Sequence, residues 1–365
     1  MSLIPARVSE FRPGELWPDQ RGVHINAHGG GILFHEGIYY WFGEHKIDGT
    51  AGNNAEVGVH VYSSSDLYQW KDEGIALEVS ADPASPITRG CVLERPKVVY
   101  NRRTRKFVMW FHLEKGSNYS TAKSGVAVAD LPTGPFQFLH CLRPNAGYWP
   151  SNVPEELKKP LDDKERAQLD GVKFDGGSFP EYPTQIIFRR DFANGQMARD
   201  MTLFVDDDGS AYHVYSSEEN GTLHISQLSD DYLSSSGRYA RIFPGRFHEA
   251  PTLMKRRGTY FLFSSGCTGW NPNAARLSMA KSLLGPWQEM GNPCRGSENQ
   301  TATTFNSQST FVLPVANKED AYIFMADRWR AENAIDGRYI WLPVQFDNDV
   351  PFLEWKDRWD LKFFA

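Results

Sequence analysis

Residues 199–217 read RDMTLFVDDDGSAYHVYSS, where two runs of alternating apolar residues flank a turn at Asp208 and Gly209. An Asp-Gly pair between two such runs is typical of a tight β-hairpin. Residues 247–266, FHEAPTLMKRRGTYFLFSSG, repeat the arrangement around Arg257 and Gly258. The chain therefore contains a hairpin unit that occurs more than once.

Each copy of the unit opens on a polar residue four positions before an apolar residue of its first strand. The five pairs are His28 and Ile32, Glu94 and Val98, Asp200 and Phe204, Glu249 and Leu253, and Gln308 and Val312. A second pair of strands follows four of the hairpins, at 58–74, 124–138, 221–237 and 275–291. Four strands per unit, repeated five times, predict an all-β fold, a five-bladed β-propeller. The predicted blades cover residues 22–80, 92–142, 199–245, 249–295 and 306–358.

Closing the ring would protect sheet edges that an open array exposes, so we expect a single domain over residues 1–365. The N-terminal segment with Trp17 is expected to complete or cover the last blade. Residues 143–197 interrupt the repeat, and their stretch PEELKKPLDDKERAQLD suits an exposed helix or a solvated excursion. Two interpretations of this insertion stay open. It is either a surface insertion or a wall along one side of the central depression.

Composition excludes several classes of partner and cofactor. A net charge of −6 and a pI near 6.0 give no support for binding nucleic acid. No stretch approaches the ~20 apolar residues of a membrane span. The four cysteines lack C-x-x-C spacing, and His45 and His112 lack a surrounding carboxylate cluster, so we expect no cofactor and no metal. The N-terminus lacks an apolar signal core, so we expect an exported protein, periplasmic or extracellular, if a signal peptide was removed, and a cytoplasmic one otherwise. The sequence leaves the oligomeric state open.

The opening polar residues suggest acid–base chemistry. In a closed ring they lie at one end of each innermost strand and meet in one central depression. Hydrolysis of a glycosidic bond needs one group to protonate the leaving oxygen and another to deliver water. Partial desolvation would raise the pKa of Glu249 and keep it protonated, and the nearby charge of Asp200 would help. Glu94 and Glu44 add carboxylates to the same depression.

The motifs ARDMTLFVDDDGSAYHVYSS, FHEAPTLMKRRGTYFLFSSG and GPWQEMG resemble glycoside hydrolase family 43. The resemblance extends from about residue 22 to 358 and implies a five-bladed propeller that hydrolyses glycosides with inversion. Carried over by motif, Asp200 matches the family's pKa-modulating aspartate and Glu249 its general acid.

Blade one departs from the usual pattern of the family, because INAHGGG places His28 where the catalytic base, an aspartate, is expected. His28 is therefore kept as a candidate sugar contact. The set WFGEHK, ERPKVVYN, RDMTLFVDDDG, HEAP and NSQSTFV instead resembles the exo-β-1,3-galactanase branch. That resemblance puts Gln308 at the base position and lets Glu44 and Glu94 contact the terminal galactose. The implied substrate is a plant-type β-1,3-galactan such as the arabinogalactan backbone.

A glutamine is a difficult base, since a neutral amide cannot take a proton from water near pH 7 as a carboxylate does. Gln308 could position the water through its carbonyl or relay a proton as its imidic-acid tautomer. The resemblance favours Gln308, and Glu94 is the physically simpler alternative.

Three aromatic residues are candidates for stacking on a sugar: Tyr119, Trp270 and Trp329. A structural role in the core is an equal alternative for each. Two other functions also stay open. One is another family 43 specificity, such as α-L-arabinofuranosidase or β-xylosidase. The other is a propeller that binds carbohydrate without catalysis, which the missing blade-one aspartate would favour.

Overall fold

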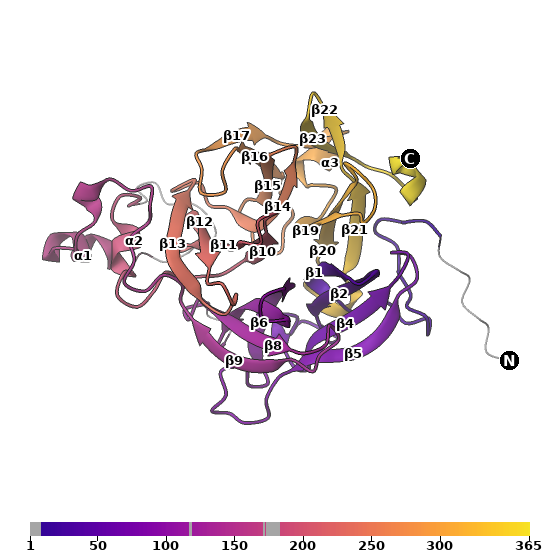
Figure 1. The fold of residues 1–365 in the computed structure, drawn as a ribbon, viewed down its shortest axis with the longest axis horizontal. Helices are drawn as coiled ribbons and strands as arrows, with labels where there is room; N and C mark the ends of the chain where they lie inside the picture. The colour runs from indigo at the N-terminus through magenta and orange to yellow at the C-terminus, as the bar shows by residue number, and fades with distance from the viewer. Residues whose placement is uncertain (1–8, 117–118, 171, 173–182) are drawn as a thin grey trace.

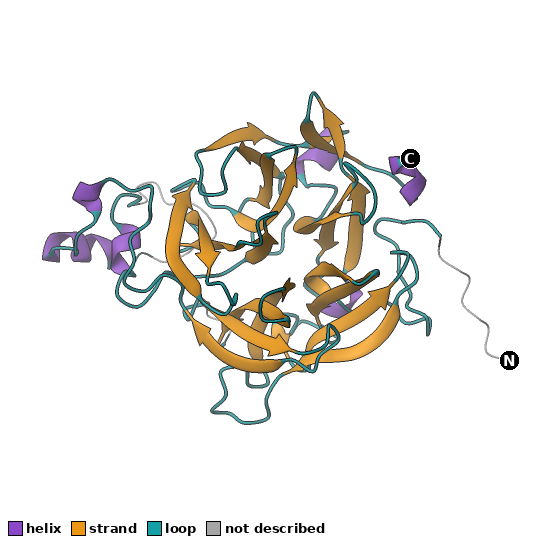
Figure 2. Cartoon of the chain, viewed as in Figure 1, coloured by secondary structure: helices purple, strands orange, loops and turns teal. Residues whose placement is uncertain are grey.

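The computed structural model describes residues 9–116, 119–170, 172 and 183–365. Short β-sheets surround a common axis and present their innermost strands to the centre (Figures 1 and 2). The prediction of an all-β propeller is confirmed. Part of the predicted insertion, at 171 and 173–182, lies outside the described residues.

The described residues form six β-sheets, so the prediction of five blades is wrong. Three sheets have the expected four strands. They are β1 (His28–His35), β2 (Ile38–Glu44), β4 (Gly58–Ser64) and β5 (Lys71–Glu78); β10 (Met201–Val205), β11 (Ala211–Ser217), β12 (Thr222–Leu228) and β13 (Ser235–Ile242); and β14 (Glu249–Arg256), β15 (Thr259–Ser265), β16 (Arg276–Ala280) and β17 (Trp287–Gly291). A fourth sheet has five strands, β3 (Asn54–Ala55), β6 (Cys91–Asn101), β7 (Lys106–Glu114), β8 (Lys123–Ala129) and β9 (Gln137–Leu142).

The predicted fifth blade, 306–358, is divided between two three-stranded sheets. One contains β19 (Gln308–Pro314), β20 (Tyr322–Arg328) and β21 (Arg338–Pro343), and the other contains β18 (Cys294–Arg295), β23 (Val350–Glu354) and β22 (Gln345–Asp347). Proline has no N–H to donate to a ladder, and Pro343 ends β21 while Pro351 lies in β23. The chain then turns at Asn348 and Asp349, both at positive φ, and β23 pairs in parallel with β18. Because β23 pairs with β18 and β22, these three strands form a separate sixth sheet.

Each predicted hairpin turn is present. Gly209 has a φ of 85° between β10 and β11, and Arg257 and Gly258 have φ of 48° and 72° between β14 and β15. The first strand of each repeat lies innermost, and contacts run in sequence from β1 to β6, β10, β14, β19 and back to β1. The starts of these five strands therefore surround one central space.

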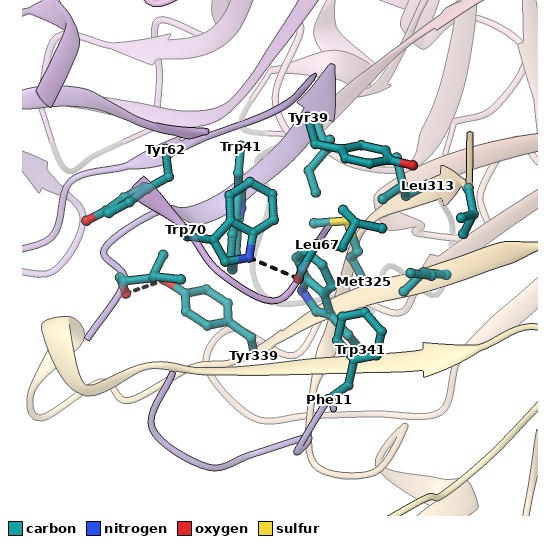
Figure 3. Packing of buried hydrophobic residues seen from close by; sticks show 14 of the residues in the cluster. Phe11, Tyr39, Trp41, Tyr62, Leu67, Trp70, Leu313, Met325, Tyr339 and Trp341 are labelled. Atoms are coloured by element: carbon teal, nitrogen blue, oxygen red, sulfur yellow. Dashed lines mark hydrogen bonds between the residues drawn. The ribbon is translucent and has the colours of Figure 1, made fainter. Parts of the chain in front are cut away.

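Aromatic packing joins the first sheet to the sheet of β19–β21, where the ring closes (Figure 3). The rings of Trp41 and Trp70 meet edge to face with 5.3 Å between their centroids. The ring centroids of Trp41 and Trp341 are 4.7 Å apart. Trp17 packs edge to face on Trp341 at 4.8 Å, and Phe11 pairs with Trp359. Such aromatic pairs contribute about 0.5–1.5 kcal/mol beyond the area they bury. The N-terminal segment therefore covers the closure, as its position in the sequence suggested.

The interrupting segment lies outside the ring beside β13 (Figure 1). It contains a 3₁₀ turn, η1 (Glu155–Leu157), and two short helices, α1 (Asp163–Leu169) and α2 (Ile187–Arg190). An Asp162 capping box starts α1. The amide of Asn152 bonds the backbone of Arg241 and fastens the segment to β13. The remaining short helical elements are α3 (Glu298–Ala302), η2 (Ala334–Asp336) and η3 (Leu361–Phe364).

None of the helices in the described part of the chain has the length and apolar character required to cross a membrane.

Candidate active site

A backbone irregularity re-aims the polar residue at the start of most of the innermost strands. The pairing register shifts between His28 and Gly31 in β1, between Glu94 and Lys97 in β6, between Glu249 and Thr252 in β14, and between Ser309 and Phe311 in β19. In three of these strands the residue after the polar one has positive φ: Gly29, Arg95 and Ala250. β-Bulges twist a strand locally and change the direction of its side chains. In β6 and β14 the bulge directly follows Glu94 and Glu249, and both side chains line the pocket described next.

The structure brings eight of the nine predicted site residues to one pocket of about 850 Å³. They are Glu44, Glu94, Tyr119, Asp200, Glu249, Trp270, Gln308 and Trp329. Five residues of the interrupting segment also line the pocket, namely Arg143, Val172, Arg190, Asp191 and Met197. The segment therefore forms one wall of the pocket.

His28 is the predicted residue that the structure does not place in the pocket. Its side chain is completely buried, and its ring stacks on Tyr339 at 5.2 Å between centroids. A Cβ on Gly337 would lie 2.7 Å from the imidazole, so the glycine makes room for the ring. His28 is therefore a packing residue and takes no part in the function proposed below.

Glu249 lies beside Asp200 on the neighbouring strand. The amide of Asn220 donates to Glu249 Oε1 at 2.8 Å, and the backbone N–H of Ala250 donates to Asp200 Oδ2 at 3.1 Å. Burial, followed by the negative charge of Asp200, raises the pKa of Glu249 to about 8. Glu249 is therefore protonated at neutral pH and can donate a proton into the pocket.

Glu94 has the opposite electrostatic environment. Burial alone would raise its pKa, but the hydrogen bond and charge of His112, the charge of Lys46 and the hydrogen bond of Tyr119 together lower the pKa to about 2. His112 Nδ1 lies 3.0 Å from Glu94 Oε2, and the Tyr119 hydroxyl donates to Glu94 Oε1 at 2.6 Å. Between about pH 2 and pH 8, Glu94 is therefore a carboxylate while Glu249 is protonated.

Arg95 connects several of the acidic groups. Its backbone N–H donates to Glu44 Oε1 at 2.9 Å, and its guanidinium Nη2 lies 3.0 Å from Asp200 Oδ2. Lys46 Nζ lies 2.5 Å from the other oxygen of Glu44. The cations of Arg95 and Lys46 thus hold the carboxylates of Asp200 and Glu44 in fixed positions.

The neighbours of Gln308 fix the orientation of its amide. Arg95 Nη2 and Trp329 Nε1 can only donate, and they lie 2.5 and 3.0 Å from the same amide atom. That atom must be the carbonyl oxygen, and the amide nitrogen then donates to Ser265 Oγ at 3.0 Å. Both lone pairs of the oxygen are engaged. One N–H of Gln308 remains to bind a ligand.

The aromatic candidates differ in exposure. Tyr119 and Trp329 are partly buried and bond Glu94 and Gln308 with their polar atoms. Trp270 is 39% exposed and meets Trp329 edge to face at 6.2 Å, so it forms the rim of the pocket.

Sequence reasoning missed Arg95, His112 and Asn220 as parts of the site. Arg95 directly follows Glu94, but the alternation of a strand would point it to the opposite face. The bulge with φ of 55° at Arg95 changes that. Asn220 follows a turn in which Glu218 and Glu219 also have positive φ. The polar sequence EENG at 218–221 marks a turn but does not reveal its direction.

Glu94, His112 and Asp200 each bring one potential metal-ligating atom within 4.8 Å of the others. However, both ring nitrogens of His112 already lie 3.0 Å from carboxylate oxygens, those of Glu94 and Glu114. Asp200 is similarly paired with Arg95. We therefore assign this cluster to ion pairs.

Comparison with known proteins identifies the family. The profile of the family Glycosyl hydrolases family 43 matches residues 177–349. A solved GH43 β-1,3-galactosidase, in complex with galactodeoxynojirimycin, is 50% identical over 96% of this chain and 100% of its own, with a TM-score of 0.89. The chain belongs to glycoside hydrolase family 43.

Other relatives of the family 43 chain are more distant. An exo-β-1,3-galactanase variant from Phanerochaete chrysosporium, solved with β-1,3-galactotriose, is 31% identical with a TM-score of 0.76, over 96% of this chain and 68% of its own. An exo-β-1,3-galactanase from Clostridium thermocellum is 34% identical with a TM-score of 0.75, over 96% and 66%. A curated relative, the β-D-galactofuranosidase xynD of Aspergillus niger, is 27% identical over 47% of this chain. The match spans half the length of that relative.

The charge of Asp200 should be visible in the pH dependence of this family 43 chain. Asp200→Asn is expected to lower the pKa of Glu249 by about one unit, since a like charge within a few ångströms shifts a carboxyl by that order. A group that must be protonated loses activity as pH rises through its pKa. The alkaline limb of kcat/KM should therefore move to lower pH, and a pH–rate profile measures the shift. Asp207→Asn, at a side chain that is 86% exposed, is the control and should leave the limb in place.

Proposed function

We propose that this chain is an exo-acting, inverting glycosidase that removes terminal galactose from β-1,3-linked galactan, such as the arabinogalactan backbone. The observation that carries the proposal is the pair Glu249 and Glu94. They line one pocket, and their pKa values are moved in opposite directions. A protonated and an ionised carboxyl group around one bond are what acid–base hydrolysis of a glycoside requires.

Glu249 is the proposed general acid. Its proton goes to the glycosidic oxygen as the bond to the anomeric carbon breaks, and the galactan that remains leaves as an alcohol. Asp200 acts on Glu249 through its charge and holds the backbone of Ala250. Asn220 fixes Glu249 Oε1 by donating to it, and the Cys267 side chain also hydrogen-bonds the carboxyl group.

Gln308 is the proposed residue that positions the attacking water. With its carbonyl oxygen held by Arg95 and Trp329, the amide offers an N–H to the water oxygen and cannot accept the water's proton there. Glu94, a carboxylate in the same pocket, is the proposed acceptor of that proton. The new bond from water to the anomeric carbon then forms opposite the bond that breaks, which inverts the configuration.

Two observations support a terminal galactose as the substrate. The solved relatives named above are β-1,3-galactosidases and exo-β-1,3-galactanases. The match to the one in complex with galactodeoxynojirimycin covers 96% of this chain and 100% of that relative. Described residues of the interrupting segment line one side of the pocket, namely Arg143, Val172, Arg190, Asp191 and Met197. A pocket closed on one side favours the end of a chain over its middle. In this proposal Glu44 accepts hydrogen bonds from hydroxyls of the terminal sugar, and Trp270 at the rim stacks on the next one.

Product analysis tests the proposed specificity. The protein is incubated with β-1,3-galactan, and released sugars are followed by chromatography over time. We expect galactose as the first and main product. 4-Nitrophenyl α-L-arabinofuranoside, β-D-xyloside and β-D-galactofuranoside are the comparison substrates. Faster turnover of any of these would replace the proposed specificity, and binding of galactan by calorimetry without turnover of any substrate would contradict an enzymatic role.

A further inference from the structure

Three buried ionisable side chains, Glu94, His112 and Glu114, form a chain that begins at the pocket, and the first two of them line it. Glu94 on β6 lies directly opposite His112 on β7 in the pairing register. Glu114 follows two residues later on β7, so it shares the face of His112. His112 Nδ1 lies 3.0 Å from Glu94 Oε2, and His112 Nε2 lies 3.0 Å from Glu114 Oε1. The imidazole thus bridges two carboxylates.

Both ring nitrogens of His112 must carry a proton for both contacts to be hydrogen bonds, because a neutral imidazole donates from one nitrogen only. Burial alone would lower the pKa of His112, but its hydrogen bonds to Glu114 and Glu94 raise the pKa to about 9. Glu114 is fully buried and also accepts the backbone N–H groups of Thr121 and Ala122. These bonds keep Glu114 fixed and ionised, so it can hold the proton on His112.

Other charges face this chain of residues. Lys46 and Arg95 add positive charge near Glu94, and Asp200 adds negative charge. The Tyr119 hydroxyl donates to Glu94 Oε1 and accepts from the Asn53 amide at 2.7 Å. Of the interactions that lower the pKa of Glu94, the hydrogen bond from His112 is the strongest.

We propose that His112 and Glu114 are positioning residues that keep Glu94 ionised and aimed into the pocket, so that the enzyme works in acid. His112 lines the pocket beside Glu94, whereas Glu114 is not among the residues that line it. Glu114 acts through His112, and His112 acts through Glu94. The inference rests on the proposed function for its kinetic consequence, whereas the charge on His112 can be measured without any substrate.

Two variants separate charge from shape. In Glu114→Gln the new amide can still accept the N–H of Thr121 with its carbonyl oxygen and donate from its NH₂ group to His112 Nε2. Nε2 must then be unprotonated, so the imidazole becomes neutral while Nδ1 still donates to Glu94. His112→Gln keeps one donor but no charge. With either variant the pKa of Glu94 should rise toward or above the ordinary glutamate value of about 4.3. A group needed as a carboxylate loses activity as pH falls through its pKa, so an acidic limb should emerge there.

The kinetic readout is kcat/KM for β-1,3-galactobiose from about pH 4 to pH 7. In both variants we expect kcat/KM to fall about threefold from pH 7 to pH 4 if the pKa of Glu94 rises to about 4.3, because about one third of the groups stay ionised at pH 4, and about tenfold if the pKa rises to about 5. The wild-type protein should stay nearly constant over the same range. The control is His60→Gln, which removes a buried histidine paired with Asp72 outside the pocket. Even if this control variant is less stable, its kcat/KM should stay nearly constant over the same pH range.

The second readout is the imidazole ¹⁵N shift of His112 by NMR. We expect a protonated ring at pH 7 in the wild-type protein and a neutral ring in Glu114→Gln. A neutral His112 in the wild-type protein at pH 7 would overturn the inference even if the enzyme cleaves galactan. If the protein does not cleave galactan but His112 is protonated at pH 7, the proposed function is contradicted, whereas the proposed charge on His112 is supported. Variants with the wild-type pH profile would also overturn the inference.

Discussion

Glu249→Gln is expected to lower kcat/KM for β-1,3-galactobiose by about 10³-fold, within the range that general acid catalysis contributes. The amide keeps the shape of the side chain and can still contact Asn220, but it has no acidic proton to give. A galactoside with a 2,4-dinitrophenyl leaving group needs no proton, so the same variant should cleave it almost as fast as the wild-type enzyme. Initial rates on both substrates measure the difference.

The pH profile gives an independent check on Glu249. Burial and the charge of Asp200 raise its pKa to about 8, so the wild-type enzyme should lose activity above that pH as the acid gives up its proton. The alkaline limb should vanish in Glu249→Gln, because glutamine does not titrate. Equal losses on the two substrates would mean that Glu249 has a structural role, and the acid would then lie elsewhere.

Glu94→Ala is expected to lower kcat/KM by about 10²–10⁴-fold, because the acceptor of the water's proton is lost. Azide needs no base to attack and fits the space that the side chain leaves. Adding azide should therefore restore turnover and give α-galactosyl azide, which mass spectrometry and NMR identify.

Gln308→Ala is the matched variant for Glu94→Ala. It should lose about 10²-fold through poorer positioning of the water, with little rescue by azide. Azide rescue of Gln308→Ala and none of Glu94→Ala would reverse the assignment and make Gln308 the base. The hydrogen bonds of Arg95 and Trp329 to the Gln308 carbonyl argue for the first outcome, since an imidic-acid tautomer would place a hydroxyl against two donors.

The sequence predicted the site better than it predicted the number of sheets. Alternation of apolar residues identified the innermost strands, and the polar residue at the start of each was visible because the repeat places it at a constant offset. Ring closure then brings Glu94, Asp200, Glu249 and Gln308 together, and all four line the pocket. Their shared pocket follows from the repeat, whereas their catalytic roles stay predictions.

Local exceptions to the repeat could not be read in the same way. The sixth sheet depends on parallel pairing of Cys294–Arg295 with β23, and alternation along a strand does not specify its partner. The burial of His28 depends on the space left by Gly337, which lies far from it in sequence. Arg95 enters the site because a bulge breaks the alternation that would otherwise point it away. These features come from tertiary contacts, and a single sequence does not display them.

The stereochemistry of the first product tests the account most directly. β-1,3-Galactobiose is hydrolysed in an NMR tube, and the anomeric protons of released galactose are recorded before mutarotation. A protonated Glu249 on one side of the bond and a water activated by Glu94 and Gln308 on the other predict that α-galactose forms first and β-galactose follows by mutarotation. Initial formation of β-galactose would contradict the account, because retention requires a nucleophile that bonds to the sugar instead of a water.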